Sequence, residues 1–154
     1  MLTAGNPAVL AGSFWIDLYA GTGAVGIEAL SRGAARVCFV ESSPAAVQII
    51  HENLTSLQIT SRFDVIRADA LEGLGRIRAG IPPADYVFLD PPYRLEHAYL
   101  STLDFLAGSP RLKQTSIVIT EHRKKFDPGE KFGRLTRYRT LHQGEAALSF
   151  FRQA

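Results

Sequence analysis

The sequence has little cysteine and no long apolar run, and both absences narrow what the protein can be. Cys38 is the single cysteine among 154 residues, which excludes an internal disulfide and a metal site built from several cysteines. No apolar run approaches the roughly 20 residues that a membrane-spanning helix needs. The N-terminal stretch MLTAGNPAVLAGSFW lacks the basic start of a secretory signal. We therefore expect a cytoplasmic protein that does not bind membranes.

Metal-ligand spacing is also missing. The four histidines show no such spacing among themselves or with Cys38, so we predict packing or surface roles for them and no metal site. These histidines are His51, His97, His122 and His142.

Length and charge indicate one globular domain with one basic end. At 154 residues, 46% of them apolar and 21% charged, the chain fits a single domain over residues 1–154, with residues 1–12 as a short N-terminal extension. Residues 1–110 carry 7 Lys and Arg against 11 Asp and Glu, whereas residues 111–154 carry 10 against 4. Most of this excess lies in residues 111–139. Such a stretch fits a nucleic-acid contact, and a solvated surface is the alternative explanation.

Strand-like and helix-like segments alternate, which predicts an α/β fold with a parallel, doubly wound sheet. The predicted parallel strands cover residues 13–19, 36–41, 63–69, 85–90 and 116–122, and the predicted helices cover residues 24–33, 43–54, 70–80 and 96–107. The last two strand-like segments, 134–143 and 146–153, meet at Gly144 with no room for a helix, so they must be antiparallel. A seven-stranded sheet with an antiparallel C-terminal hairpin differs from the six parallel strands of a dinucleotide-binding domain.

The stretch DLYAGTGAVGIEAL, residues 17–30, carries a glycine loop between the first predicted strand and helix. Gly21, Gly23 and Gly26 follow the spacing G-x-G-x-x-G that is typical of dinucleotide binding. In a dinucleotide enzyme this loop holds a pyrophosphate, and the carboxylate of Asp17 would lie unfavourably close to that anion. S-adenosylmethionine has no phosphate, and Asp17 can attract its α-amino group. The loop thus favours S-adenosylmethionine, with a nicotinamide oxidoreductase as the alternative.

Further acids follow the second and third predicted strands. Glu41 can accept both ribose hydroxyls of the cofactor, and Asp69 with Ala70 can meet its adenine edge. Ligands of such sheets bind at the carboxyl ends of the strands, so the acids at three successive strand ends predict a single crevice. The alternative is that Glu41 and Asp69 merely favour the N-termini of the helices that follow them.

A second motif, DPPY, follows the fourth predicted strand and suggests the chemistry. The two prolines stiffen the loop and leave its carbonyls free to accept hydrogen bonds. An exocyclic amine of a nucleobase is a poor nucleophile, and two acceptors around its N–H groups would direct its lone pair toward a methyl group. The Asp90 carboxylate and the Pro91 carbonyl can be these acceptors, and Tyr93 can stack on the base. A rigid turn with a packed tyrosine is the alternative.

The segments DLYAGTGAVGIEALSRGA, VCFVE, RADA and VFLDPPY resemble the RsmD family of bacterial 16S rRNA guanine-N2 methyltransferases, and the resemblance extends from Phe14 over nearly the whole chain. It implies S-adenosylmethionine-dependent methylation of a guanine in 16S rRNA or the small ribosomal subunit. It also implies that Asp90, Pro91 and Tyr93 are catalytic. The predicted cofactor-binding residues are Asp17, Ala20, Gly21, Gly23, Glu41, Ser42, Asp69 and Ala70.

The sequence departs from the family at its N-terminus. Members normally begin with a segment that contains a basic, Gly-rich hairpin and an Arg-Pro-Thr stretch and that is implicated in closing over the cofactor and gripping RNA. Here MLTAGNPAVLAG stands in that place, so we expect the segment to be lacking.

Two alternatives to an rRNA guanine methyltransferase stay open. One is an N6-adenine DNA methyltransferase, because DPPY recognises an amine and not a particular base, and the other is a catalytically silent cofactor- or RNA-binding module.

Overall fold

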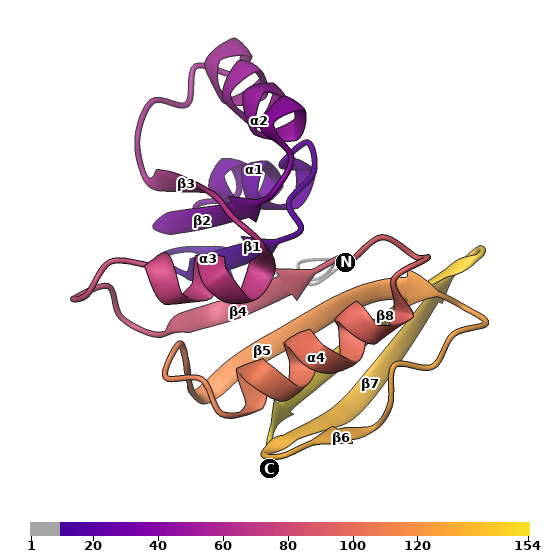
Figure 1. Cartoon of the computed structure of the whole chain (residues 1–154). Coiled ribbons are helices and arrows are strands. Elements are labelled where there is room, and N and C mark those ends of the chain that lie inside the picture. Colours follow the sequence, from indigo (N-terminus) through magenta and orange to yellow (C-terminus); the bar gives the residue numbers. More distant parts are fainter. Residues whose placement is uncertain (1–9) are drawn as a thin grey trace. The chain divides into compact units, whose positions relative to one another are not determined.

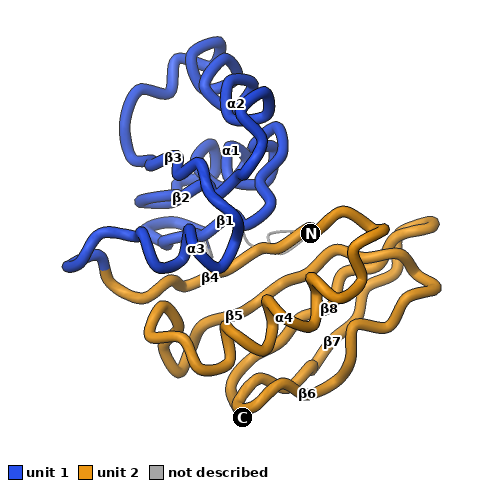
Figure 2. Tube along the Cα trace, in the orientation of Figure 1, with its two compact units in different colours: residues 1–81 blue, residues 82–154 orange. Residues whose placement is uncertain are grey.

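The computed structural model describes residues 10–154 and divides into two compact units, residues 1–81 and 82–154 (Figure 2). Residues 1–9 of the predicted N-terminal extension lie outside the described residues. The first unit contains β1 (Phe14–Leu18), α1 (Ala24–Ser31), β2 (Arg36–Glu41), α2 (Pro44–Ser56), β3 (Phe63–Arg67) and α3 (Ala70–Arg76) (Figure 1). The second unit contains β4 (Ala84–Leu89), α4 (Glu96–Ala107), β5 (Leu112–Arg123), β6 (Lys131–Phe132), β7 (Leu135–Gln143) and β8 (Ala146–Gln153).

In the first unit, three parallel strands are arranged in the order β3-β2-β1. The middle strand, β2, is buried from Val37 to Val40, as expected for a parallel strand that is covered on both faces. The helix α2 begins with Pro44 in its first turn, and the Ser43 hydroxyl accepts a hydrogen bond from the Ala46 N–H at 3.2 Å. The chain therefore leaves each strand at the same edge of the sheet and returns through a helix.

In the second unit, β4 and β5 are parallel, and β8, β7 and β6 continue the sheet in antiparallel order. The tight turn between β7 and β8 has Gly144 at a φ of 60°, a conformation that glycine adopts without strain. β8 lies between β5 and β7, and its residues Leu148, Phe150 and Phe151 are buried. The helix α4 lies along this sheet, with Tyr99 and Leu103 fully buried (Figure 1).

The structure confirms the α/β class, the parallel strands and the antiparallel C-terminal hairpin, but it corrects the strand count. The described residues form eight strands, because the two residues of β6 pair with Thr136 and Leu135 of β7. A strand of two residues is too short to show an alternating pattern in the sequence. α3 ends at Arg76 because Ile77 is extended, with a ψ of 130°. No helix within residues 10–154 is long and apolar enough to cross a membrane.

Candidate functional site

The glycine loop of the first unit is a tight turn between β1 and α1. Tyr19, Gly21 and Gly23 have φ values of 56°, 58° and 80°, so three residues within five take the left-handed conformation. For the non-glycine Tyr19 this conformation is uncommon, and such positions cluster at binding and active sites. The Gly23 N–H donates to the Ala20 carbonyl at 2.8 Å. A Cβ on Gly21 would meet nothing within 4 Å, so the space that a cofactor needs is open at this glycine.

Asp17 is buried, with 2% of its surface exposed, and it anchors the end of the glycine loop. Its Oδ2 accepts a hydrogen bond at 3.1 Å from the N–H of Gly26, in the first turn of α1. A carboxylate at a helix N-terminus also interacts favourably with the helix dipole. The contact of Asp17 with an α-amino group stays a prediction, and the structure adds a role in holding the turn.

Glu41 joins the turns that follow β1 and β2. Its Oε1 accepts from the Gly21 N–H at 2.8 Å, and its Oε2 accepts from the Ser43 N–H at 2.9 Å. Each carboxylate oxygen has a second lone-pair site, so both can also accept a ribose hydroxyl. The side-chain cap of α2 comes from Ser43, and the Glu41 carboxylate binds the backbone N–H of this cap residue while keeping a second lone pair on each oxygen.

The third acid, Asp69, is exposed after β3. It is the N-cap residue of α3, yet its side chain makes no capping hydrogen bond. Ala70 beside it is buried, whereas Ser42 is exposed and Ala20 is half-buried. Because β1, β2 and β3 are parallel, the structure brings the predicted cofactor residues of the first unit to one edge of its sheet.

A separate cavity of about 170 Å³ lies in the first unit, lined in part by β2 and β3. Asp64, Ile66, Arg76 and Ile81 are among its lining residues. None of the residues that line it is among the predicted cofactor-binding residues.

In the second unit, Asp90 directly follows β4 and stands beside a second carboxylate. β4 and β5 are in parallel register, with Leu89 opposite Thr120, so Asp90 and Glu121 occupy the next position on each chain. Burial, and to a smaller extent the negative charge of Glu121, together raise the pKa of Asp90 to about 7. The sequence analysis did not identify Glu121, and the strand register is the signal that pairs it with Asp90.

The Pro91 carbonyl is held by a buried tyrosine. Tyr99 of α4 donates its hydroxyl hydrogen to this oxygen at 3.2 Å. The Tyr99 ring packs against Phe126, with ring centroids 5.1 Å apart. Burial raises the pKa of Tyr99, so the hydroxyl stays a donor. A carbonyl oxygen has two lone pairs, and the second one is left for a target amine. Sequence reasoning missed Tyr99 as well.

Tyr93 is half-exposed, as a stacking surface must be. The Arg123 guanidinium lies 5.1 Å from its ring centroid, so a base stacking on Tyr93 would use the other face of the ring or displace Arg123. Burial, the charges of Glu121 and Asp90 and a side-chain hydrogen bond with Glu121 raise the pKa of Tyr93, while Arg123 lowers it. The structure thus brings Asp90, Pro91 and Tyr93 together in one short loop after β4.

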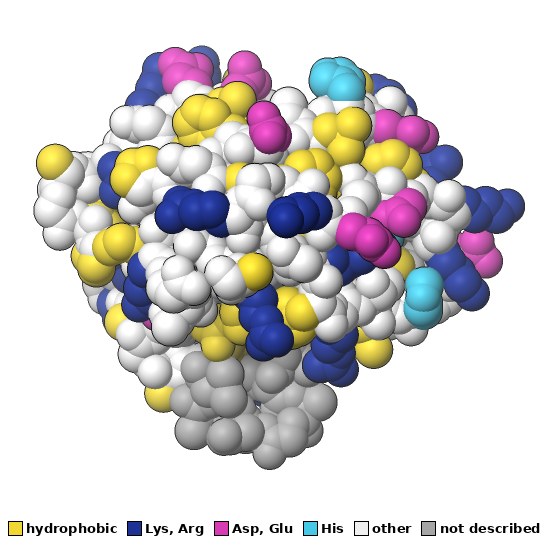
Figure 3. Space-filling model, turned by 90° about the horizontal axis from the view of Figure 1, so that it is seen from below, with side chains coloured by type: hydrophobic (Ala, Val, Ile, Leu, Met, Phe, Trp, Pro, Cys, Tyr) yellow, Lys and Arg dark blue, Asp and Glu magenta, His cyan; other side chains and the backbone are white. Residues whose placement is uncertain are grey.

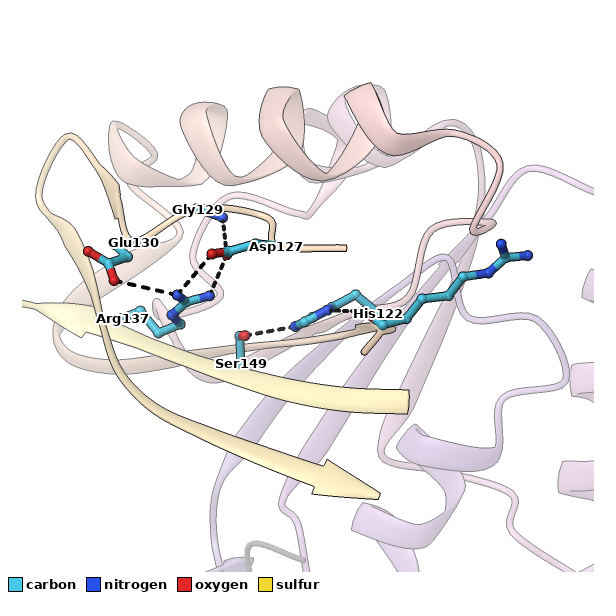
Figure 4. A network of polar contacts seen from close by, with 7 residues as sticks. His122, Asp127, Gly129, Glu130, Arg137 and Ser149 are labelled. Carbon is cyan, nitrogen blue, oxygen red and sulfur yellow. Dashed lines mark hydrogen bonds and ion pairs between the residues drawn. The ribbon is translucent and has the colours of Figure 1, made fainter. Parts of the chain in front are cut away.

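A polar network supports β5, which carries Glu121 (Figure 4). The His122 Nδ1 donates to the Arg123 carbonyl at 2.8 Å, and its Nε2 lies 2.8 Å from the Ser149 hydroxyl on β8. Beyond β5, Arg137 of β7 donates to Asp127 at 2.7 Å, and Asp127 also accepts from the Gly129 N–H at 2.9 Å (Figure 4). His122 therefore has the packing role expected for it, and Arg137, within the basic stretch, is used in an ion pair.

Comparisons with known proteins agree with this architecture. A family model described as "Conserved hypothetical protein 95" matches residues 3–152. A Bacillus subtilis protein named "Putative rRNA methyltransferase YlbH" is 30% identical over 138 residues, which are 90% of this chain and 74% of that protein. "Ribosomal RNA small subunit methyltransferase D" of Buchnera aphidicola subsp. Acyrthosiphon pisum is 32% identical over 110 residues, 71% of this chain and 56% of that protein.

A solved structure titled "Putative methyltransferase yhhF from Escherichia coli" has a TM-score of 0.83 to this chain at 25% identity, covering 99% of this chain and 82% of that one. The α/β fold, with its antiparallel C-terminal hairpin, is the fold of S-adenosylmethionine-dependent methyltransferases. The family match covers nearly all of the sequence, including the glycine loop and DPPY. The chain therefore belongs to the family described as Conserved hypothetical protein 95, and it is an RsmD-type protein.

Proposed function

We propose that this chain transfers a methyl group from S-adenosylmethionine to the exocyclic N2 amine of a guanine in 16S rRNA. The observation that carries this proposal is the loop after β4, where the Asp90 carboxyl group and the Pro91 carbonyl are two acceptors beside a half-exposed Tyr93. The names of the relatives, which refer to rRNA and to the small ribosomal subunit, support the substrate class.

The first unit supplies the residues that fit the cofactor. Asp17 holds the glycine loop and carries the negative charge that suits an α-amino group, and Glu41 has lone pairs for both ribose hydroxyls. Asp69 and Ala70 would meet the adenine. When bound, S-adenosylmethionine supplies a methyl group on a positively charged sulfur, which keeps the electron pair of the broken carbon–sulfur bond.

The second unit supplies the residues that hold the amine. One amine hydrogen is donated to the Asp90 carboxylate and the other to the Pro91 carbonyl, which Tyr99 holds in place. The amine nitrogen then forms the new bond to the methyl carbon with its lone pair and releases one proton, which Asp90 or water can accept. Because the nitrogen becomes acidic as it gains the methyl group, no stronger base is required.

The first experiment is titration of the chain with S-adenosylmethionine and, separately, with NADH by calorimetry. We expect saturable binding of S-adenosylmethionine alone. Transfer of a labelled methyl group to small ribosomal subunits and to duplex DNA is then compared, and the methylated base is identified by mass spectrometry. Label on N2 of a guanine in 16S rRNA supports the proposal, whereas label on adenine N6 in DNA favours the alternative methyltransferase. Binding of the cofactor without transfer to any ribosomal substrate favours a silent binding module.

The role of Asp90 has its own test. We expect Asp90→Ala to lower the rate of methyl transfer about 10²-fold or more, because it removes one preorganised polar group at the reacting nitrogen. Asp104 on α4 is an exposed acid of the same unit, and Asp104→Ala is the matched control that keeps its rate. Full activity of Asp90→Ala would contradict the assigned role.

A further inference from the structure

The two acceptors at Asp90 and Pro91 recognise an amine, but they do not choose the base that carries it. Adenine and guanine both have an exocyclic amine with two hydrogens. They differ at the neighbouring ring position, because N1 of guanine carries a hydrogen and donates, whereas N1 of adenine accepts. A third acceptor beside Asp90 would therefore distinguish the two bases.

Glu121 has the position that such an acceptor needs. It follows Thr120 on β5, which is opposite Leu89 in the register, so Glu121 stands next to Asp90 at the carboxyl ends of two adjacent parallel strands. It is half-exposed, in contrast to the buried residues 118–120 before it. A base held by Asp90 would thus meet Glu121 at its side.

Glu121 is also linked to the stacking residue. The Glu121 carboxylate raises the pKa of Tyr93 through its charge and its interaction with the tyrosine hydroxyl. Two positions along β5, on the same face of the strand, Arg123 covers the Tyr93 ring at 5.1 Å. One carboxylate oxygen can hold the tyrosine hydroxyl while the other faces the base.

We propose that Glu121 determines base specificity by accepting the N1–H of the target guanine, next to the amine held by Asp90 and Pro91. This inference rests on the function proposed above and extends it. Adenine in the same position would place the lone pair of its N1 against the Glu121 carboxylate, which is repulsive. A base without the N1 hydrogen would also leave that carboxylate without its partner, and such a mismatch strongly disfavours a substrate.

The test isolates the N1 hydrogen with 2-aminopurine, which keeps the amine on C2 but has an acceptor at N1 and no oxygen on C6. Small ribosomal subunits are reconstituted from 16S rRNA ligated around an oligonucleotide with guanine or 2-aminopurine at the methylated position. Initial rates of methyl transfer are measured for the unmodified chain and for Glu121→Gln. For each enzyme, the rate on guanine divided by the rate on 2-aminopurine gives its preference for guanine. The missing C6 oxygen of 2-aminopurine lowers the rate of both enzymes alike, so the ratio of their two preferences reports on the N1 contact alone.

We expect the unmodified chain to prefer guanine over 2-aminopurine by about 10- to 100-fold, which is the usual discrimination of one good base contact. In Glu121→Gln the side-chain amide can donate to the acceptor N1, so the preference should fall to about threefold or less. Glu121→Asp keeps an acceptor and should retain the preference for guanine at a reduced rate.

An equal loss of rate on both substrates in Glu121→Gln would mean that Glu121 only supports Tyr93, and it would overturn the inference. An unchanged preference would do the same, as would loss of the preference in Glu121→Asp when that variant binds S-adenosylmethionine normally. If the unmodified chain methylates guanine in neither natural nor reconstituted subunits, the proposed function itself fails. The rate on natural subunits therefore separates the two failures.

Discussion

At the scale of single residues, Asp90 combines a partly buried carboxyl group with a second carboxylate as its neighbour. Burial is the main reason why its pKa rises to about 7, and the Glu121 charge adds to the shift. Only the ionised form is a full acceptor for an amine hydrogen. The proposed role therefore makes activity depend on pH around neutrality, where an ordinary aspartate would already be fully ionised.

We expect kcat/KM for methyl transfer to rise about tenfold between pH 6 and pH 8, because this parameter reports the ionisation of an essential group in the free enzyme. The midpoint should lie near the Asp90 pKa of about 7. Rates on small ribosomal subunits, measured in buffers of constant ionic strength, test this expectation. In Asp90→Asn the residual rate should not change over the same range, and a flat profile of the unmodified chain would contradict the role of Asp90.

The same ionisation affects stability, in the opposite direction to most aspartates. The folded pKa of Asp90 is above the unfolded value of 3.8, so the protonated carboxyl group stabilises the fold fully below about pH 4. This contribution is lost as the pH rises through the folded pKa of about 7. Denaturant unfolding at several pH values should show that Asp90→Asn is less stable relative to the unmodified chain at low pH than at high pH.

Residues within one motif could be found from the sequence, and residues that meet through the fold could not. Asp90, Pro91 and Tyr93 are neighbours in the chain. Glu121 follows Asp90 by more than thirty residues, and their proximity depends on the register of β4 against β5. Tyr99 has the spacing of a core residue on α4, and only its hydrogen bond to the Pro91 carbonyl shows a second role.

At the scale of elements, α1 and β2 meet at a point where only glycine fits. A Cβ on Gly26 would lie 2.3 Å from Cε1 of Phe39 and 2.8 Å from Cγ1 of Val37. The Gly26 N–H also holds Asp17 at 3.1 Å. Gly26 therefore sets the distance between α1 and β2, and through its N–H it also sets the position of the Asp17 carboxylate.

We expect Gly26→Ala to lower the free energy of unfolding by about 1–3 kcal/mol, the usual cost of overpacking a well-packed core. Affinity for S-adenosylmethionine should fall as well, since Asp17 and the glycine loop move with α1.

Gly75 is the matched control for Gly26. It lies in α3, is exposed, and a Cβ there would meet nothing within 4 Å. Gly75→Ala should be neutral or stabilising by up to about 1 kcal/mol. Denaturant unfolding and calorimetry of both variants measure the two effects, and equal stabilities would contradict this account.

The elements themselves were largely predictable, since their patterns are local. The predicted strand 36–41 and helix 96–107 have the bounds that the structure shows. β5 begins at Leu112, earlier than predicted, in a polar stretch whose pairing changes register between Ala84 and Tyr86 of β4. The additional residues of β5, like the two residues of β6, are strands because they pair with neighbouring strands. This pairing cannot be predicted from the local sequence.

At the scale of the whole molecule, charge separates the two compact units. Residues 1–81 carry 6 Lys and Arg against 7 Asp and Glu, and residues 82–154 carry 11 against 8. On the face in Figure 3, Lys and Arg side chains are spread among hydrophobic and uncharged ones. Much of the basic stretch is engaged within its own unit, since Lys113 pairs with Asp85 and Arg139 lies over the Phe150 ring. Its net charge alone therefore overstates the surface available to RNA.

Lys124 and Lys125 differ from these residues, because both are exposed and form no ion pair within the described part of the chain. If the basic stretch contacts rRNA, the double variant Lys124→Ala/Lys125→Ala should weaken binding to small ribosomal subunits. The slope of log K against log salt should also become shallower by about one to two, as expected when two phosphate contacts are lost. Filter binding at several salt concentrations measures both quantities.

Arg137→Ala provides the contrast within the same stretch. The Arg137 side chain is 16% exposed, and its guanidinium donates to Asp127 at 2.7 Å. We therefore expect Arg137→Ala to lower the free energy of unfolding by about 1–2 kcal/mol and to leave the salt slope unchanged. The double lysine variant should unfold like the unmodified chain. If Arg137→Ala changed the salt slope and the lysine variant did not, the RNA contact would lie on β7, and the exposed turn after β5 would be only a solvated surface.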